Sequence, residues 1–151
     1  MITIEDFKNE ITKKSRLIGL DLGSKRIGIA ICDEHQSIAT PFKTIHKDNF
    51  INFLEELKLI VKENNIKGII VGNPINMDGS SGPSAQSVKD VCSNILKNIN
   101  MPLCLWDERL STVAAFNLSS QLDTKVSKKI KNIDQNAAAF ILQGVLDYLK
   151  N

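Results

Sequence analysis

Residues 17–31 read LIGLDLGSKRIGIAI, two apolar segments joined by a glycine-containing turn, with one acid, Asp21, near the end of the first. This pattern predicts two adjacent β-strands, from about Arg16 to Asp21 and from Arg26 to Asp33. An ionised carboxylate in an apolar segment needs a partner, a metal ion or an open site to offset its lost hydration. Asp21 is therefore the first candidate functional residue, although an aspartate here could also simply cap the turn at Gly23.

Further isolated acids follow at two other predicted element ends. Asp107 and Glu108 come directly after the strand-like residues 102–106, and Asp134 precedes the apolar residues 135–149. Isolated acids at element ends suggest that they share one site. The alternative for Asp134 is a helix N-cap, which stabilises a helix by about 1 kcal/mol without any catalytic role.

The bulk composition is that of a soluble globular protein. The chain has 151 residues, of which 42% are hydrophobic and 24% charged, so we expect one domain over residues 1–151. No segment is long enough to span a bilayer and no secretory signal is visible, which predicts a cytoplasmic protein without membrane contact. Cys32, Cys92 and Cys104 form no C-x-x-C pair and lie in apolar stretches, so we expect them to be reduced and buried.

The net charge of +2 does not by itself indicate nucleic-acid binding. Basic residues cluster, however, at 13–16 and at 125–131, and either cluster could form a polyanion-binding face or a solvated loop. His35 and His46 lack a second histidine or a cysteine at metal-ligand spacing, so we expect surface positions for both.

Hydrophobic periodicity predicts alternating strands and helices. An extra helix within residues 1–15, capped by Thr3, is expected as an addition to the core. The further elements expected are a third strand at 37–45, a helix capped by Asp48, a strand at 67–72, a helix around 88–99, a strand ending at Trp106, and helices at 111–122 and 134–149.

The loop at residues 72–84 is rich in glycine, serine and asparagine and joins a strand to a helix start. Open α/β sheets bind ligands at such positions, and small residues let backbone N–H groups approach a phosphate. Asn73, Asn76 and Ser80 are the candidate phosphate-binding residues, whereas the alternative is a simple turn-rich connection. The next motif, residues 107–112, adds Arg109 to the two acids, a mixture suited to holding a metal ion and a phosphate together.

Four motifs together resemble one known family. LDLGSKRIG (20–28), GNPINMDG (72–79), DERLST (107–112) and DQNAAA (134–139) occur in the order found in the YqgF family, also called RuvX. Its members are bacterial proteins related to Holliday-junction resolvases and described as pre-16S rRNA nucleases. The resemblance runs from about Arg16 to the C-terminus.

The resemblance implies an α/β protein with an RNase H-like fold, a mixed five-stranded sheet flanked by helices. It also implies that Asp21, Glu108 or Asp107, and Asp134 form the catalytic site and converge on Mg²⁺ or Mn²⁺. Residues 72–74 are Gly-Asn-Pro where related nucleases carry an acid, so a one-metal site is conceivable. Strand alternation separates Asp107 from Glu108, and we favour Glu108 as the ligand because of its reach.

The partner implied is nucleic acid, with pre-rRNA preferred over branched DNA. Arg26, Arg109, Lys128 and Lys129 are then candidates for backbone phosphates, which predicts salt-sensitive binding. The alternatives are a Holliday-junction resolvase, a non-catalytic nucleic-acid-binding module and an actin-like ATPase lobe. The chain is expected to be a monomer or a homodimer.

Overall fold

The computed structural model describes residues 1–74, 82–107 and 133–150, with only the backbone considered at 133–135. Its elements, in chain order, are α1 (Ile4–Glu10), β1 (Arg16–Leu22), β2 (Arg26–Cys32), β3 (Ala39–His46), α2 (Phe50–Glu63), β4 (Ile66–Asn73), α3 (Pro83–Asn98), β5 (Leu103–Asp107) and α6 (Ile133–Leu149). The expected helix at 111–122 lies outside the described residues.

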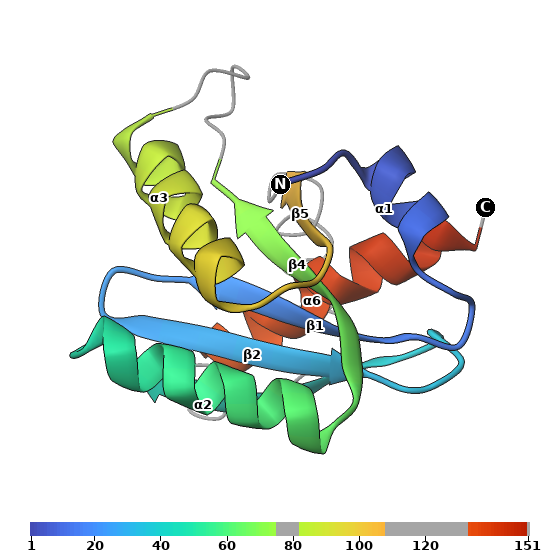
Figure 1. Ribbon diagram of the computed structural model, residues 1–151, viewed down its shortest axis with the longest axis horizontal. Coiled ribbons are helices and arrows are strands. Elements are labelled where there is room, and N and C mark those ends of the chain that lie inside the picture. Colours follow the sequence, from blue (N-terminus) through green and yellow to red (C-terminus); the bar gives the residue numbers. More distant parts are fainter. Residues whose placement is uncertain (75–81, 108–132, 151) are drawn as a thin grey trace, which may run out of the picture.

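The strands form one five-stranded sheet in the order β3-β2-β1-β4-β5 (Figure 1). β2 is antiparallel to both of its neighbours, whereas β4 is parallel to β1 and to β5. The carboxyl ends of β1, β3, β4 and β5 therefore lie at the same edge of the sheet, which we call the carboxyl edge. The predicted meander and parallel crossover are confirmed.

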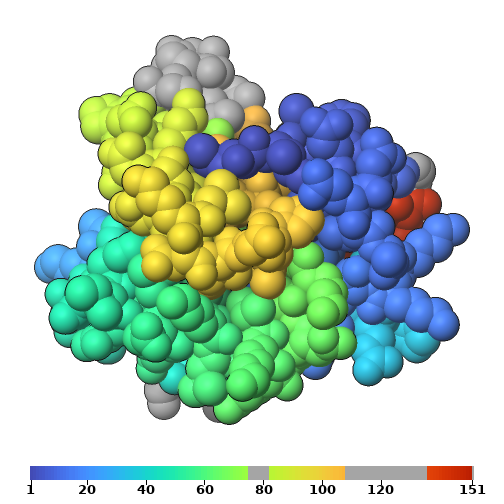
Figure 2. Space-filling model, in the orientation of Figure 1, coloured from blue at the N-terminus to red at the C-terminus, as the bar shows by residue number. Residues whose placement is uncertain are grey.

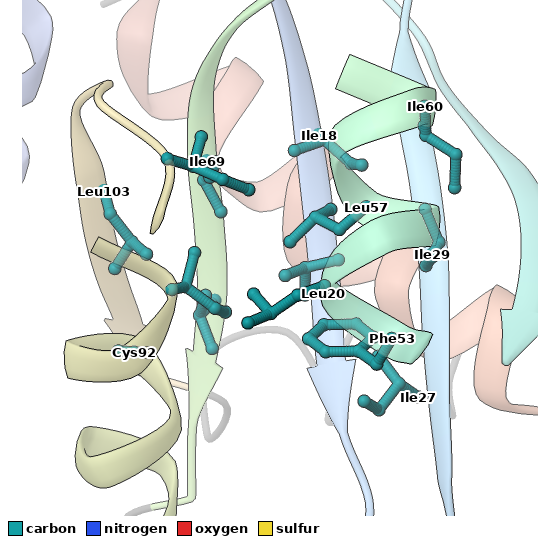
Figure 3. Packing of buried hydrophobic residues seen from close by; sticks show 14 of the residues in the cluster. Ile18, Leu20, Ile27, Ile29, Phe53, Leu57, Ile60, Ile69, Cys92 and Leu103 are labelled. Atoms are coloured by element: carbon teal, nitrogen blue, oxygen red, sulfur yellow. The ribbon is translucent and has the colours of Figure 1, made fainter. Parts of the chain in front are cut away.

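Two helices, α2 and α3, cover the near face of the sheet in Figure 1. Their apolar sides bury the larger core cluster, in which Phe53 and Leu57 of α2 meet Leu20 and Ile29 of the sheet (Figure 3). The N-cap of α2 is Asn49, whose side chain accepts from the N–H groups of Ile51 and Asn52, and not Asp48 as the sequence suggested.

The third strand begins at Ala39, two residues later than expected. The N–H groups of Ser37 and Ile38 donate to Asp33 Oδ1 at 2.7 and 2.9 Å, so neither group joins the ladder with β2. The hydrogen bonds from Ile38 and Ser37 also hold the pKa of the Asp33 carboxyl below its usual value. The carboxylate thus closes the turn between β2 and β3.

Helix α6 covers the opposite face and lies behind the sheet in Figure 1. It comes very close to β1 at Gly19, where a Cβ atom would stand 2.8 Å from Leu142 Cβ and 3.1 Å from the Ala138 carbonyl oxygen. Real Cβ atoms do not come that close to their neighbours, so this contact depends on glycine. Ala138 and Leu142 are both fully buried there.

Helix α1 is part of the core, which corrects the expectation of a mere addition. Phe7 is fully buried on the α6 face, in a cluster with Leu17, Ile70 and Cys104. Thr3 caps the helix as expected. Ahead of it, the Ile2 N–H donates to the Leu103 carbonyl at 3.0 Å, so the chain start extends the sheet beyond β5; Figure 2 shows these dark-blue residues beside the orange ones of β5.

Substituting the two closely packed glycines tests these contacts. We expect Gly19→Ala to destabilise the protein by about 1–3 kcal/mol, because it meets a helix backbone that cannot move locally. Gly68→Ala meets only the ends of the Phe7 and Leu17 side chains, which can shift, so its cost should be smaller. Urea unfolding of both variants measures the two costs. An equal or larger loss for Gly68→Ala would contradict the assignment of α6 as the rigid neighbour.

Candidate functional site

Three polar residues, Asp21, Asn73 and Asp107, lie where β1, β4 and β5 end. The register pairs Asn73 with Asp107 and Gly72 with Trp106. Leu20 pairs with Val71, which sets Asp21 level with Gly72. The acids predicted from separate parts of the chain are thus brought to one edge of the sheet.

Asp21 and Asp107 nevertheless belong to opposite faces. Side chains alternate along a strand, so Asp21 shares the face of Gly19, which packs on α6. Asp107 shares the face of Leu105, which packs against the cluster under α2 and α3. Asn73 lies on the same face as Asp107, because the two residues are register partners. Of the acids on β1, β4 and β5, only Asp21 is at the carboxyl edge on the α6 side of the sheet.

The first turn of α6 lies near Asp21. Ala138 and Leu142 contact Gly19, and Gln143 Nε2 donates to the Ser37 carbonyl at 3.1 Å, close to the start of β3. Because β3 runs parallel to β1, α6 runs from the carboxyl edge towards the opposite edge. Asp134 precedes Ala138 by one helical turn, so its backbone is at the level of Asp21. Its side chain is not among those described.

Arg26 is the cation placed nearest to Asp21 by register. Asp21 pairs with Gly28, and Arg26 lies two residues before Gly28 on the same strand. Diagonal neighbours of this kind lie on one face at roughly 7–8 Å, within reach of a long side chain. Both residues have interactions within the protein.

Asn73 carries a buried acceptor that the described residues do not satisfy. Its Oδ1 is buried and has no hydrogen-bond partner among them. A buried unsatisfied acceptor costs about 1–3 kcal/mol, so such an atom is expected to receive a donor or a cation. A phosphate is an acceptor and could be held only by the Nδ2 group of this side chain.

The chemistry of these donors fits a hard divalent cation. Mg²⁺ and Mn²⁺ prefer carboxylate and carbonyl oxygen, which Asp21 and an Asp134 side chain would supply on the α6 face. The described residues hold no cluster of three His, Cys, Asp or Glu side chains able to bind a metal ion. A complete ligand set therefore requires residues beyond the described ones.

The three cysteines are free and buried, as predicted. Burial raises the pKa of Cys92 to about 12 and of Cys104 to about 11, and it also raises the pKa of Cys32. Thiols in this state stay protonated at neutral pH and are poor nucleophiles. The chemistry of the chain therefore rests on its oxygen and nitrogen groups.

Other predicted site residues lie outside the described part of the chain. They are Asn76, Ser80, Glu108, Arg109, Lys128 and Lys129. His46 is exposed, as predicted, and it lies at the end of β3 as the register partner of Arg26, a position that the sequence analysis did not predict. The signal available for it was the apolar Ile45 before it, which continues the strand.

Among the residues that the structure describes, none of the helices has the length and apolar character needed to span a bilayer.

Comparison with known proteins gives matches over nearly the whole chain. The family model described as "RuvX: Holliday junction resolvase" matches residues 15–148. A protein of Pelagibacter ubique named "Putative pre-16S rRNA nuclease" is 72% identical over 151 residues, which cover 100% of both chains. A protein of Cereibacter sphaeroides with the same name is 44% identical, over 97% of this chain and 91% of its own.

The solved structures establish the fold. Thermus thermophilus RuvC in complex with a Holliday junction substrate superposes with a TM-score of 0.59 at 8% identity, covering 91% of this chain and 97% of that one. At such low identity the likeness concerns the fold alone, which is RNase H-like as the sequence resemblance implied. The family match, the two relatives and the fold agree, and the chain belongs to the RuvX family.

Proposed function

We propose that this protein is a metal-dependent nuclease that processes the 5′ end of pre-16S rRNA in the cytoplasm. The observation that carries the proposal is the position of Asp21, at the carboxyl edge of the sheet and on the face covered by α6, whose first turn contains Asp134. The names of the full-length relatives support rRNA as the substrate.

Asp21, Glu108 and Asp134 would hold Mg²⁺ or Mn²⁺. Strand alternation supports Glu108 over Asp107, because Asp107 lies on the face away from Asp21. A cation held there would orient water, lower its pKa and stabilise negative charge on the phosphate. Asp107 and Asn73, on the other face, would support the strand ends that position the site.

The chain's own residues orient the scissile phosphate. Arg26, diagonal to Asp21 on the same face, would neutralise a phosphate oxygen, and its register position supports this role. Asn76, Ser80 and Arg109 would hold the neighbouring phosphates, with Lys128 and Lys129 farther along. Water attacks phosphorus in line with the bond to O3′, that bond breaks, and O3′ takes a proton, leaving a 5′-phosphate and a 3′-hydroxyl.

The experiment that tests this function compares two end-labelled substrates, a 5′-extended 16S rRNA precursor and a four-way DNA junction, with Mg²⁺ or Mn²⁺. Cleavage of the RNA alone supports the proposal. Symmetric cutting of the junction would favour the resolvase activity in the family description and would call for a homodimer, because two strands must be cut. Binding without cleavage of either substrate would favour a non-catalytic module, and ATP binding would favour an ATPase lobe.

Asp21→Asn should reduce cleavage by more than about a hundredfold, because it removes the charge that holds the cation while keeping the side-chain shape. Stability in urea should change by less than about 0.5 kcal/mol, since the side chain is only partly buried. Asp90→Asn, an exposed acid on α3, is the matched control and should cleave normally. Undiminished cleavage by Asp21→Asn would rule out this site.

Glu108→Gln should impair cleavage more than Asp107→Asn, and it should raise the Mg²⁺ concentration needed for half-maximal activity. The reason is that Asp107 lies on the face away from Asp21, so that a residue following it in the same alternation would return to the face of Asp21. Metal titrations of the two variants, assayed side by side, make the comparison. If Asp107→Asn shifted the metal dependence more than Glu108→Gln, Asp107 would be the ligand.

A further inference from the structure

The turn between β1 and β2 lies beside the end of β3 at the carboxyl edge. The Lys47 N–H donates to the Lys25 carbonyl at 2.8 Å, and Arg26 pairs with His46. The backbones of four basic residues from two distant segments therefore lie side by side at this edge. We call this group, Lys25, Arg26, His46 and Lys47, the basic row.

The basic row begins next to the candidate site. Arg26 lies on the α6 face, as Asp21 does, and its register partner His46 shares that face. Lys25 and Lys47 are one residue farther out, beyond the last paired residues of β2 and β3. The row thus leads from Asp21 across β2 to the outer strand β3, a span of two strand spacings or about 10 Å.

The side chains of the row are accessible. Lys25, Arg26 and His46 are exposed, and Lys47 is partly exposed. Within the described residues, neither Lys25 nor Lys47 forms an ion pair, whereas Lys43 is bound to Glu56 at 3.3 Å and Lys58 approaches Glu55 at 3.9 Å. The neighbouring acid along the chain, Asp48, offsets part of the charge, which leaves a net positive surface.

Helix α2 adds to this field. It begins at Phe50, and only residues 47–49 separate it from the end of β3, so its N-terminus lies at the same edge as the basic row. The N-terminal end of a helix carries partial positive charge, which favours a nearby anion. The helix dipole therefore reinforces the lysines and does not oppose them.

We propose that the basic row binds the sugar–phosphate backbone of an RNA strand as that strand leaves the site at Asp21. This inference rests on the proposed function, because it takes Asp21 as the point of cleavage. Lys25 and Lys47 contact successive phosphates by charge alone, so the binding is independent of base sequence. The strand is thereby directed over β3, away from β5.

The test measures binding separately from cleavage. A fluorescein-labelled single-stranded RNA of mixed sequence is titrated with protein in EDTA at several NaCl concentrations, and anisotropy gives the affinity. Lys25→Ala/Lys47→Ala is compared with Lys62→Ala/Lys67→Ala, which removes the same charge from exposed lysines at the end of α2 and the start of β4, the opposite edge of the sheet. Urea unfolding checks that both double variants fold.

Lys25→Ala/Lys47→Ala removes two phosphate contacts and should lower the affinity for RNA by about tenfold. It should also reduce the steepness of log K against log salt by about 1.4, because each phosphate contact on a single strand contributes roughly 0.7. The control variant should bind like the wild type. The proposed role of the basic row would be overturned by any of three results: equal losses of affinity in both variants, an unchanged salt slope in Lys25→Ala/Lys47→Ala, or no measurable RNA binding by the wild type. RNA binding through Lys25 and Lys47 without cleavage would overturn only the proposed nuclease function.

Discussion

The close approach of α6 to β1 at Gly19 is the constraint on which the arrangement of the site depends. Because the backbone and Cβ atoms of α6 occupy the space of a side chain there, the helix has one position against the sheet. That position brings the start of α6 to the level of Asp21. Asp21 and the start of α6, which are more than a hundred positions apart in the chain, are thus brought to the same level by packing.

The sheet separates the polar residues at its carboxyl edge into two groups. Asp21 and Arg26 lie towards α6, whereas Asn73 and Asp107 lie towards α2 and α3. This separation follows from the alternation of side chains along each strand. The two acids, which are of the same residue type, therefore have different proposed roles. Asp21 lies on the face of the proposed reaction, whereas Asp107 supports the strand ends from the other face.

The N-terminal residues extend the sheet beyond β5 and add to the core on the face covered by α6. Phe7 fills the space over Gly68, and Ile2 pairs with the outer side of β5. Near the end of α6, the Tyr148 hydroxyl donates to Glu5 of α1 at 3.2 Å. The Tyr148 ring also packs edge-on against Trp106 of β5, with ring centroids 5.8 Å apart. Helix α1 therefore links the end of α6 to β5, the strand that leads into Asp107.

The sequence by itself determined the order of strands and helices and the positions of the isolated acids, because apolar periodicity is a local property of the chain. The RNase H-like fold was implied by the resemblance of four sequence motifs to the RuvX family. The role of α1, the start of β3 and the face of each acid were decided by tertiary structure. Burial of Phe7 needs Gly68 on a distant strand, and the hydrogen bonds of Asp33 compete with the β2–β3 ladder. The basic row likewise depends on the pairing of β2 with β3, which brings Lys47 beside Lys25.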